Sequence, residues 1–233
     1  MRLNLSAVGL VFLLSSAVSA QQLSRQEKIQ QIDTLNAQIA ALENDILMPD
    51  TSDARQAKSE GFEIFRLMPR EKYDHKLTVQ GGGAYFSFTT GSHDYKKNAQ
   101  IKLEQNFLSV GFAGADYGFM KDLGNRSLAD VTKETAEISF LMNYRPPNIM
   151  ADIRREQRKS DNYETDTATY SSRVIAAIDH VYALRSISFD RSDVLVVFKV
   201  FRKDVDGSLV IFWKWLETFD KPEYLVERGP DNN

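Results

Sequence analysis

The stretch 194-VLVVFKVF-201, followed after the turn 204-DVDG-207 by 209-LVIFWKWL-216, decides the fold. An Asp-Gly step between two apolar runs is a strong signal for a β-hairpin. Both runs are rich in β-branched and aromatic residues, which suit strands, and both are apolar at nearly every position. Strands of this kind are typical of the middle of a sheet that is covered on both faces. The sequence therefore predicts a central antiparallel hairpin.

Outward from this hairpin, most of the chain alternates apolar and polar residues with a period of two, which indicates half-buried strands. The segments with this pattern or with short β-type runs are 73–80, 85–89, 99–104, 106–113, 115–120, 136–144, 173–178 and 181–189. Only the segment from Pro147 to Lys159 has helical features in this half of the chain, with Pro147 suited to a first turn. We therefore expect a mainly β domain over residues 61–228, an antiparallel β-sandwich or barrel-like fold with one short helix. Residues 229–233 are expected to be a disordered tail.

The segment 21–48 has a different period and predicts a helix. It contains no Gly or Pro before Pro49, and Ser24 with Glu27 forms a capping-box pattern. Its apolar residues repeat at spacings of three and four, as in a coiled coil. They are Ile32, Leu35, Ile39, Leu42 and Ile46. Two interpretations stay open: an oligomerising coiled coil, or an amphipathic helix that lies on the domain. The polar segment 49–60 is expected to be a linker or a short second helix.

The first 20 residues resemble a secretory signal peptide in their layout. Arg2 precedes an apolar run, Val8 to Leu14, and Val18 and Ala20 provide small residues before a cleavage point at Gln21. The chain has no cysteine, so its fold does not depend on disulfides. The net charge of −3 gives no reason to expect a nucleic-acid partner. We expect a secreted or periplasmic protein without a transmembrane span in its mature form.

The candidate site is the polar turn 91-GSHDY-95. Adjacent residues on a strand point to opposite faces, but in a turn the side chains of His93, Asp94 and Tyr95 can converge. Asp116 and Tyr117 are added as ligand-binding candidates. No run such as HExxH is present, so neither a metal nor a cofactor is expected. The glycines Gly81 to Gly83 lie between two expected strands with no helix to complete an anion site, which favours a turn or bulge.

These features favour an exported, non-enzymatic β-domain protein with a binding or structural role. A homo-oligomer formed through residues 23–47 and an unidentified small ligand, glycan or protein are the expected partners. One alternative is an exported hydrolase with a site around His93 and Asp94. Another is an outer-membrane barrel, against which Lys199 and Lys214 count because they lie within the most apolar strands. Asn125 begins a formal glycosylation sequon, which is meaningful only in a eukaryotic secretory pathway.

Overall fold

The computed structural model describes residues 23–166 and 168–225, so the expected signal peptide and the tail 229–233 lie outside the described residues. The chain divides into two compact units, residues 1–38 and 39–233. Helix α1 (Arg25–Leu47) begins in the first unit and ends in the second. The predicted capping box at its start is confirmed, because Ser24 N–H donates to Glu27 Oε2 at 2.7 Å and Glu27 N–H donates to Ser24 Oγ at 3.2 Å.

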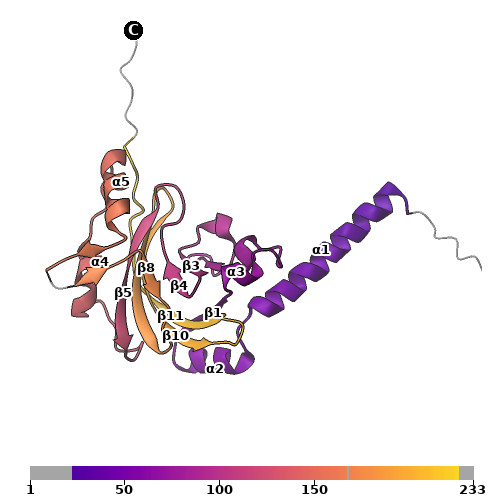
Figure 1. The fold of residues 1–233 in the computed structure, drawn as a ribbon, viewed down its shortest axis with the longest axis horizontal. Coiled ribbons are helices and arrows are strands. Elements are labelled where there is room, and N and C mark those ends of the chain that lie inside the picture. Colours follow the sequence, from indigo (N-terminus) through magenta and orange to yellow (C-terminus); the bar gives the residue numbers. More distant parts are fainter. Residues whose placement is uncertain (1–22, 167, 226–233) are drawn as a thin grey trace, which may run out of the picture. The chain divides into compact units, whose positions relative to one another are not determined.

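The larger unit is built around a five-stranded antiparallel sheet with the strand order β1-β11-β10-β9-β5 (Figure 1). Its strands are β1 (Glu63–Leu67), β5 (Tyr117–Asn125), β9 (His180–Ser188), β10 (Ser192–Lys203) and β11 (Leu209–Phe219). The predicted hairpin is confirmed as β10 and β11, and β10 is the middle strand. Gly207 closes the turn at a φ of 92°, where its N–H donates to Asp204 O at 2.9 Å.

A second, four-stranded antiparallel sheet has the order β2-β3-β4-β8, and a two-stranded ribbon pairs β6 with β7. The bounds are β2 (Tyr85–Phe86), β3 (Ile101–Glu104), β4 (Phe107–Ser109), β6 (Tyr163–Glu164), β7 (Thr169–Tyr170) and β8 (Arg173–Ile175). The remaining helices are α2 (Thr51–Ser59), α3 (Arg70–Tyr73), α4 (Ser139–Asn143) and α5 (Met150–Lys159). Single 3₁₀ turns are η1 (Gln80–Gly83), η2 (Tyr95–Lys97) and η3 (Ala136–Ile138).

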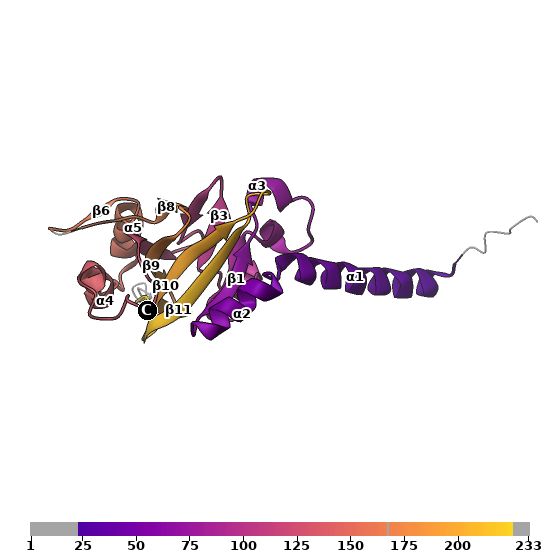
Figure 2. The ribbon, with the colours of Figure 1, turned by 90° about the horizontal axis from the view of Figure 1, so that it is seen from below.

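The five-stranded sheet has one hydrophobic core on each face, which explains the nearly continuous apolar runs of β10 and β11. Val196, Phe198 and Val200 face the core shared with the four-stranded sheet. Leu195 and Val197, which alternate with them, face the core that is closed by α2, α4 and α5. Figure 1 shows α4 and α5 on the side of β5 away from β3 and β4, and Figure 2 shows α2 beside β1.

Two predicted strands are wrong, and the fold is mixed rather than mainly β with one short helix. Residues 136–144 form η3 and α4, because Ile138, Leu141 and Tyr144 also repeat at a spacing of three and bury one helical face. Residues 73–80 have no strand partner: α3 ends at Tyr73, and Glu43 accepts from the backbone N–H and the hydroxyl of Thr78. The segment expected as linker or second helix is α2.

Gly83 lies against Leu47, the last residue of α1, at a place where a larger residue would not fit. It has a φ of 79°, and a Cβ placed on it would lie 2.2 Å from Leu47 Cδ2. Leu47 and Glu43 are the two buried residues of α1, so they are the points at which the helix end packs on the larger unit. No helix within the described ranges is long and apolar enough to cross a membrane.

A buried ion pair crosses the α4 side of the sheet. Arg185 on β9 and Asp193 on β10 are each 1% exposed, and Arg185 donates to both carboxylate oxygens at 2.8 and 2.7 Å. The other terminal nitrogen of Arg185 donates to the carbonyls of Leu141 and Tyr144, and its guanidinium carbon lies 3.7 Å from the ring centroid of Phe219. Four of the five N–H groups of this guanidinium are therefore paired inside the core.

Arg185→Met is expected to destabilise the protein by about 3–5 kcal/mol, because it leaves the Asp193 carboxylate buried without its partner. The double variant Arg185→Met, Asp193→Leu should lose less, since no unpaired charge remains. As a control, Lys133→Met removes a half-exposed pair with Glu217 and should cost below about 1 kcal/mol. Urea unfolding measures all three, and a single variant that loses less than the double would contradict this account.

Candidate functional site

A cavity of about 480 Å³, here called the His93 pocket, lies in the larger unit between the end of α1, the edge strand β1 and the loop that follows β2. Its apolar walls are formed by Leu47, Met48, Pro49, Ile64, Phe65, Phe86 and Trp213. Asn44, Glu63 and His93 supply the polar side chains, and Gly91 completes the lining. A concave site of this volume with apolar walls and few polar groups is typical of small-molecule binding sites.

Aromatic rings give the pocket a rigid wall. The rings of Phe65 and Phe86 stack with centroids 3.8 Å apart, and Trp213 lies edge-on to Phe86 at 6.5 Å. Phe65 is opposite Ile211 in the register, and Ile211 is two residues from Trp213 on the same strand. Residues two apart on a strand share a face, so Phe65 and Trp213 point to the same face of the sheet. Trp213 is directly opposite Glu63 in the register, so Glu63 is on this face as well.

His93 is held by a backbone carbonyl of the edge strand. Its Nε2 lies 2.6 Å from Arg66 O, and its ring is edge-on to Phe86 with centroids 5.4 Å apart. A carbonyl oxygen only accepts hydrogen bonds, so Nε2 carries the hydrogen. Burial lowers the pKa of His93, with the Arg66 carbonyl opposing that change in part, so the ring is neutral at pH 7. Nδ1 is then a hydrogen-bond acceptor.

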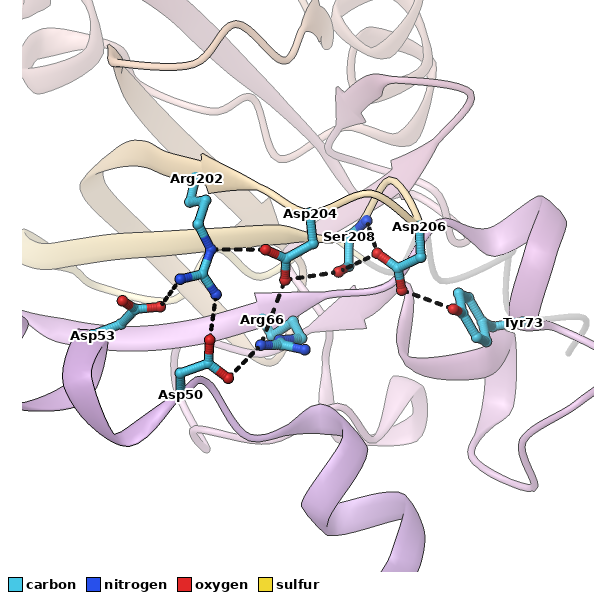
Figure 3. A network of polar contacts seen from close by, with 8 residues as sticks. All are labelled: Asp50, Asp53, Arg66, Tyr73, Arg202, Asp204, Asp206 and Ser208. Carbon is cyan, nitrogen blue, oxygen red and sulfur yellow. Dashed lines mark hydrogen bonds and ion pairs between the residues drawn. The ribbon is translucent and has the colours of Figure 1, made fainter.

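The side chain of Arg66 anchors this arrangement in an aspartate–arginine cluster of five residues (Figure 3). They are Asp50, Asp53, Arg66, Arg202 and Asp204. Arg202 contacts one carboxylate oxygen of each aspartate at distances of 2.7 to 2.8 Å. Arg66 Nη2 lies 3.3 Å from Asp50 and 3.5 Å from Asp204. The cluster joins the start of α2, strand β1 and the β10–β11 turn, and the hydrogen bond from Arg202 lowers the pKa of Asp50.

The same turn is tied to α3 on its other side. Tyr73 donates to Asp206 Oδ2 at 2.7 Å, and Ser208 donates to Asp206 Oδ1 through its hydroxyl at 2.7 Å (Figure 3). Burial opposes the charge of Asp206, but these hydrogen bonds outweigh it and lower the pKa of Asp206. The aspartates of this region are thus occupied by arginine, tyrosine and serine. Within the described residues, no group of three or more His, Asp or Glu is placed to hold a metal ion.

The structure distributes the five sequence candidates over four places. His93 lines the His93 pocket, whereas Asp94 caps η2 by accepting from Lys96 N–H at 3.0 Å. Tyr95 and Asp116 come together in a second cavity of about 300 Å³, where Arg191 lies 3.9 Å from Asp116 and burial raises the pKa of this carboxyl. Tyr117 is only 1% exposed.

Tyr117 belongs to the core on the α4 side of the sheet rather than to a surface site. Its hydroxyl lies 2.9 Å from the hydroxyl of Tyr144, and burial raises the pKa of both phenols. The sequence pattern predicts a strand over residues 115–120, and this prediction agrees with the position of Tyr117 in a strand. In the structure, Tyr117 begins β5, so its side chain alternates into the core.

Sequence reasoning missed the walls of the His93 pocket. Phe65, Phe86 and Trp213 carry the ordinary signal of strand core residues. Only the pairing of β1 with β11 brings Glu63 beside Trp213, and 150 residues of chain separate these two positions in the sequence. No local pattern encodes such a register, so the site had no signal beyond the turn at His93.

Comparison of the chain with protein-family models, with curated proteins and with solved structures finds no match.

Arg202→Met is expected to lower the free energy of unfolding by about 1–3 kcal/mol, because three carboxylates lose a shared charged donor. Lys221→Met is the control, since Lys221 and Glu223 are both exposed and 3.7 Å apart, and its effect should stay below about 1 kcal/mol. Chemical denaturation of both variants checks this, and equal effects would show that the cluster is an ordinary surface network.

His93 is expected to make the fold sensitive to acid. Because its pKa in the folded state is below the ordinary value of 6.5, the unfolded chain takes up the proton first as the pH falls. Stability contributed by the neutral ring is thus complete above pH 6.5 and decreases below it. His93→Gln, which keeps an N–H donor for Arg66 O, should flatten the decrease in unfolding free energy between about pH 8 and about pH 5. His75→Gln, at an exposed position, should follow the wild type.

Proposed function

We propose that the protein is exported and acts by binding, with the His93 pocket as its ligand site and the seam of α1 as its self-association surface. The seam is the set Ile32, Leu35, Ile39, Leu42 and Ile46. The observation that carries this proposal is that the seam remains exposed although the end of α1 packs on the larger unit. Within that unit, Ile39, Leu42 and Ile46 are 39%, 65% and 41% exposed.

The face of α1 that packs on the larger unit differs from the seam. Glu43 and Leu47 make the buried contacts, and at 100° per residue they lie about a quarter turn from the seam. Packing of the helix end therefore leaves the apolar seam free. Ile32 and Leu35 continue the same stripe toward the helix start and are also exposed. A continuous stripe of aliphatic side chains in water favours a partner that buries it.

A second copy of α1 is the occupant that fits this seam best. The stripe keeps a strict heptad spacing, with isoleucine at the a-type positions 32, 39 and 46 and leucine at the d-type positions 35 and 42. This choice favours a parallel two-stranded coil. The flanking residues Gln31, Asn36 and Gln38 are uncharged, and the two acidic flanking residues, Glu43 and Asp45, lie near the helix end, where Glu43 is bound to Thr78.

The other elements of the proposal have their own support. Export is supported by the signal-peptide pattern of the first 20 residues, with a secreted or periplasmic destination. Face-to-face packing of the two sheets through one core supports an antiparallel β-sandwich within the larger unit. Binding is favoured over hydrolysis because the recorded contacts of His93 are a carbonyl and an aromatic ring, neither of which is a nucleophile.

The double variant Leu35→Asp, Leu42→Asp should convert a dimer into a monomer, because it places two carboxylates in the apolar seam. Ala37→Asp, Ala41→Asp introduces the same charge on exposed positions away from the seam and should leave the dimer intact. Light scattering coupled to size-exclusion chromatography measures the molar mass of each. A wild-type protein that is monomeric at micromolar concentration would overturn the self-association proposal.

A further inference from the structure

The lining of the His93 pocket carries negative charge and no positive charge. Its eleven lining residues include one carboxylate, that of Glu63, and neither a lysine nor an arginine. The pocket thus offers no cation to a carboxylate or phosphate ligand. A ligand with a negative charge would meet Glu63 without compensation, which disfavours binding.

Each polar side chain of the pocket has an acceptor atom without a hydrogen bond to the described protein. Within residues 23–166 and 168–225, the side chains of Glu63 and Asn44 make no hydrogen bond or ion pair with the protein. The hydrogen bond of His93 to Arg66 O uses its N–H and leaves Nδ1 as an acceptor. A carboxylate, an amide oxygen and an imidazole nitrogen together match a ligand group that donates several hydrogen bonds.

The aromatic wall adds a preference for positive charge. Trp213 is paired across the strands with Glu63, so the indole and the carboxylate are neighbours on one face of the sheet. A cation held over the face of such a ring is attracted by the electrons of the ring, and more strongly when water is excluded. Phe65 and Phe86 then provide apolar surface for the body of the same ligand.

We infer that the His93 pocket binds a small organic ammonium compound, with the ammonium between Glu63 and Trp213 and an apolar or aromatic body against Phe65 and Phe86. A volume of about 480 Å³ accommodates a compact molecule of this kind. This inference rests on the proposed function, because it names the ligand class of the proposed binding site. The ammonium supplies the donors for which the pocket has acceptors, and its charge complements the one charge in the lining.

The test uses three probes of nearly equal size: phenethylamine, 2-phenylethanol and 3-phenylpropionate. Calorimetry gives the affinities, and the chemical shift of the Trp213 indole N–H reports binding at this site. We expect phenethylamine to bind about tenfold more tightly than 2-phenylethanol, from the ion pair and the cation–π contact together. The acid should bind more weakly than the alcohol, because its charge meets Glu63.

Glu63→Gln should weaken the binding of phenethylamine about threefold while leaving the affinity for 2-phenylethanol unchanged. Glu60→Gln is the matched control, because it makes the same change in net charge three residues away at a position outside this pocket. If the alcohol or the acid binds as well as the amine, the ligand class is wrong while pocket binding stands. If none of the three probes shifts Trp213 at millimolar concentration, the His93 pocket is not a binding site and that part of the proposed function fails.

Discussion

Arg185 lies in the row of side chains that β9 directs toward α4, between the apolar residues Ala183 and Ile187. A guanidinium in such a place requires acceptors for all of its donors, since each unmet donor would cost stability. Asp193 accepts two hydrogen bonds, and the carbonyls of Leu141 and Tyr144 accept two more. These carbonyls are available because they lie at the end of α4, where a helix leaves its last acceptors free. The helical state of this segment and the buried charge therefore depend on each other.

Arg66 connects the aspartate–arginine cluster of the larger unit with the His93 pocket. The side chain of Arg66 is held by Asp50 and Asp204, and its carbonyl holds His93. Strand β1 thus connects a network of mostly half-buried charges to the neutral imidazole of His93. Rigid placement of a few polar groups in an apolar cavity is what a selective binding site requires.

The buried residues of helix α1 lie on a different stripe from its heptad seam. Glu43 and Leu47 fix its end, with Glu43 bound to Thr78 and Leu47 packed into the space that Gly83 leaves open. Within the larger unit, the seam residues Ile39, Leu42 and Ile46 are exposed. The amphipathic pattern in the sequence fits both a coiled coil and a helix that lies on the domain. In the structure, the residues of α1 that pack on the domain are Glu43 and Leu47, which are not part of the heptad seam.

The sequence by itself determined those elements whose signals are local. The Asp-Gly turn and two runs that are apolar on both faces specify the β10–β11 hairpin, Ser24 and Glu27 specify the start of α1, and the basic segment after Pro147 becomes α5.

The tertiary structure decided the state of those segments whose partners lie far away in the sequence. Residues 136–144 fit a period of two and a spacing of three equally well, and their core contacts and Arg185 select the helix. Residues 73–80 alternate like a strand, but they pair with no strand, and Thr78 is hydrogen-bonded to Glu43 of α1. The turn at His93 was visible locally, whereas Phe65, Glu63 and Trp213 become one site only through strand register, which pairs residues far apart in the chain.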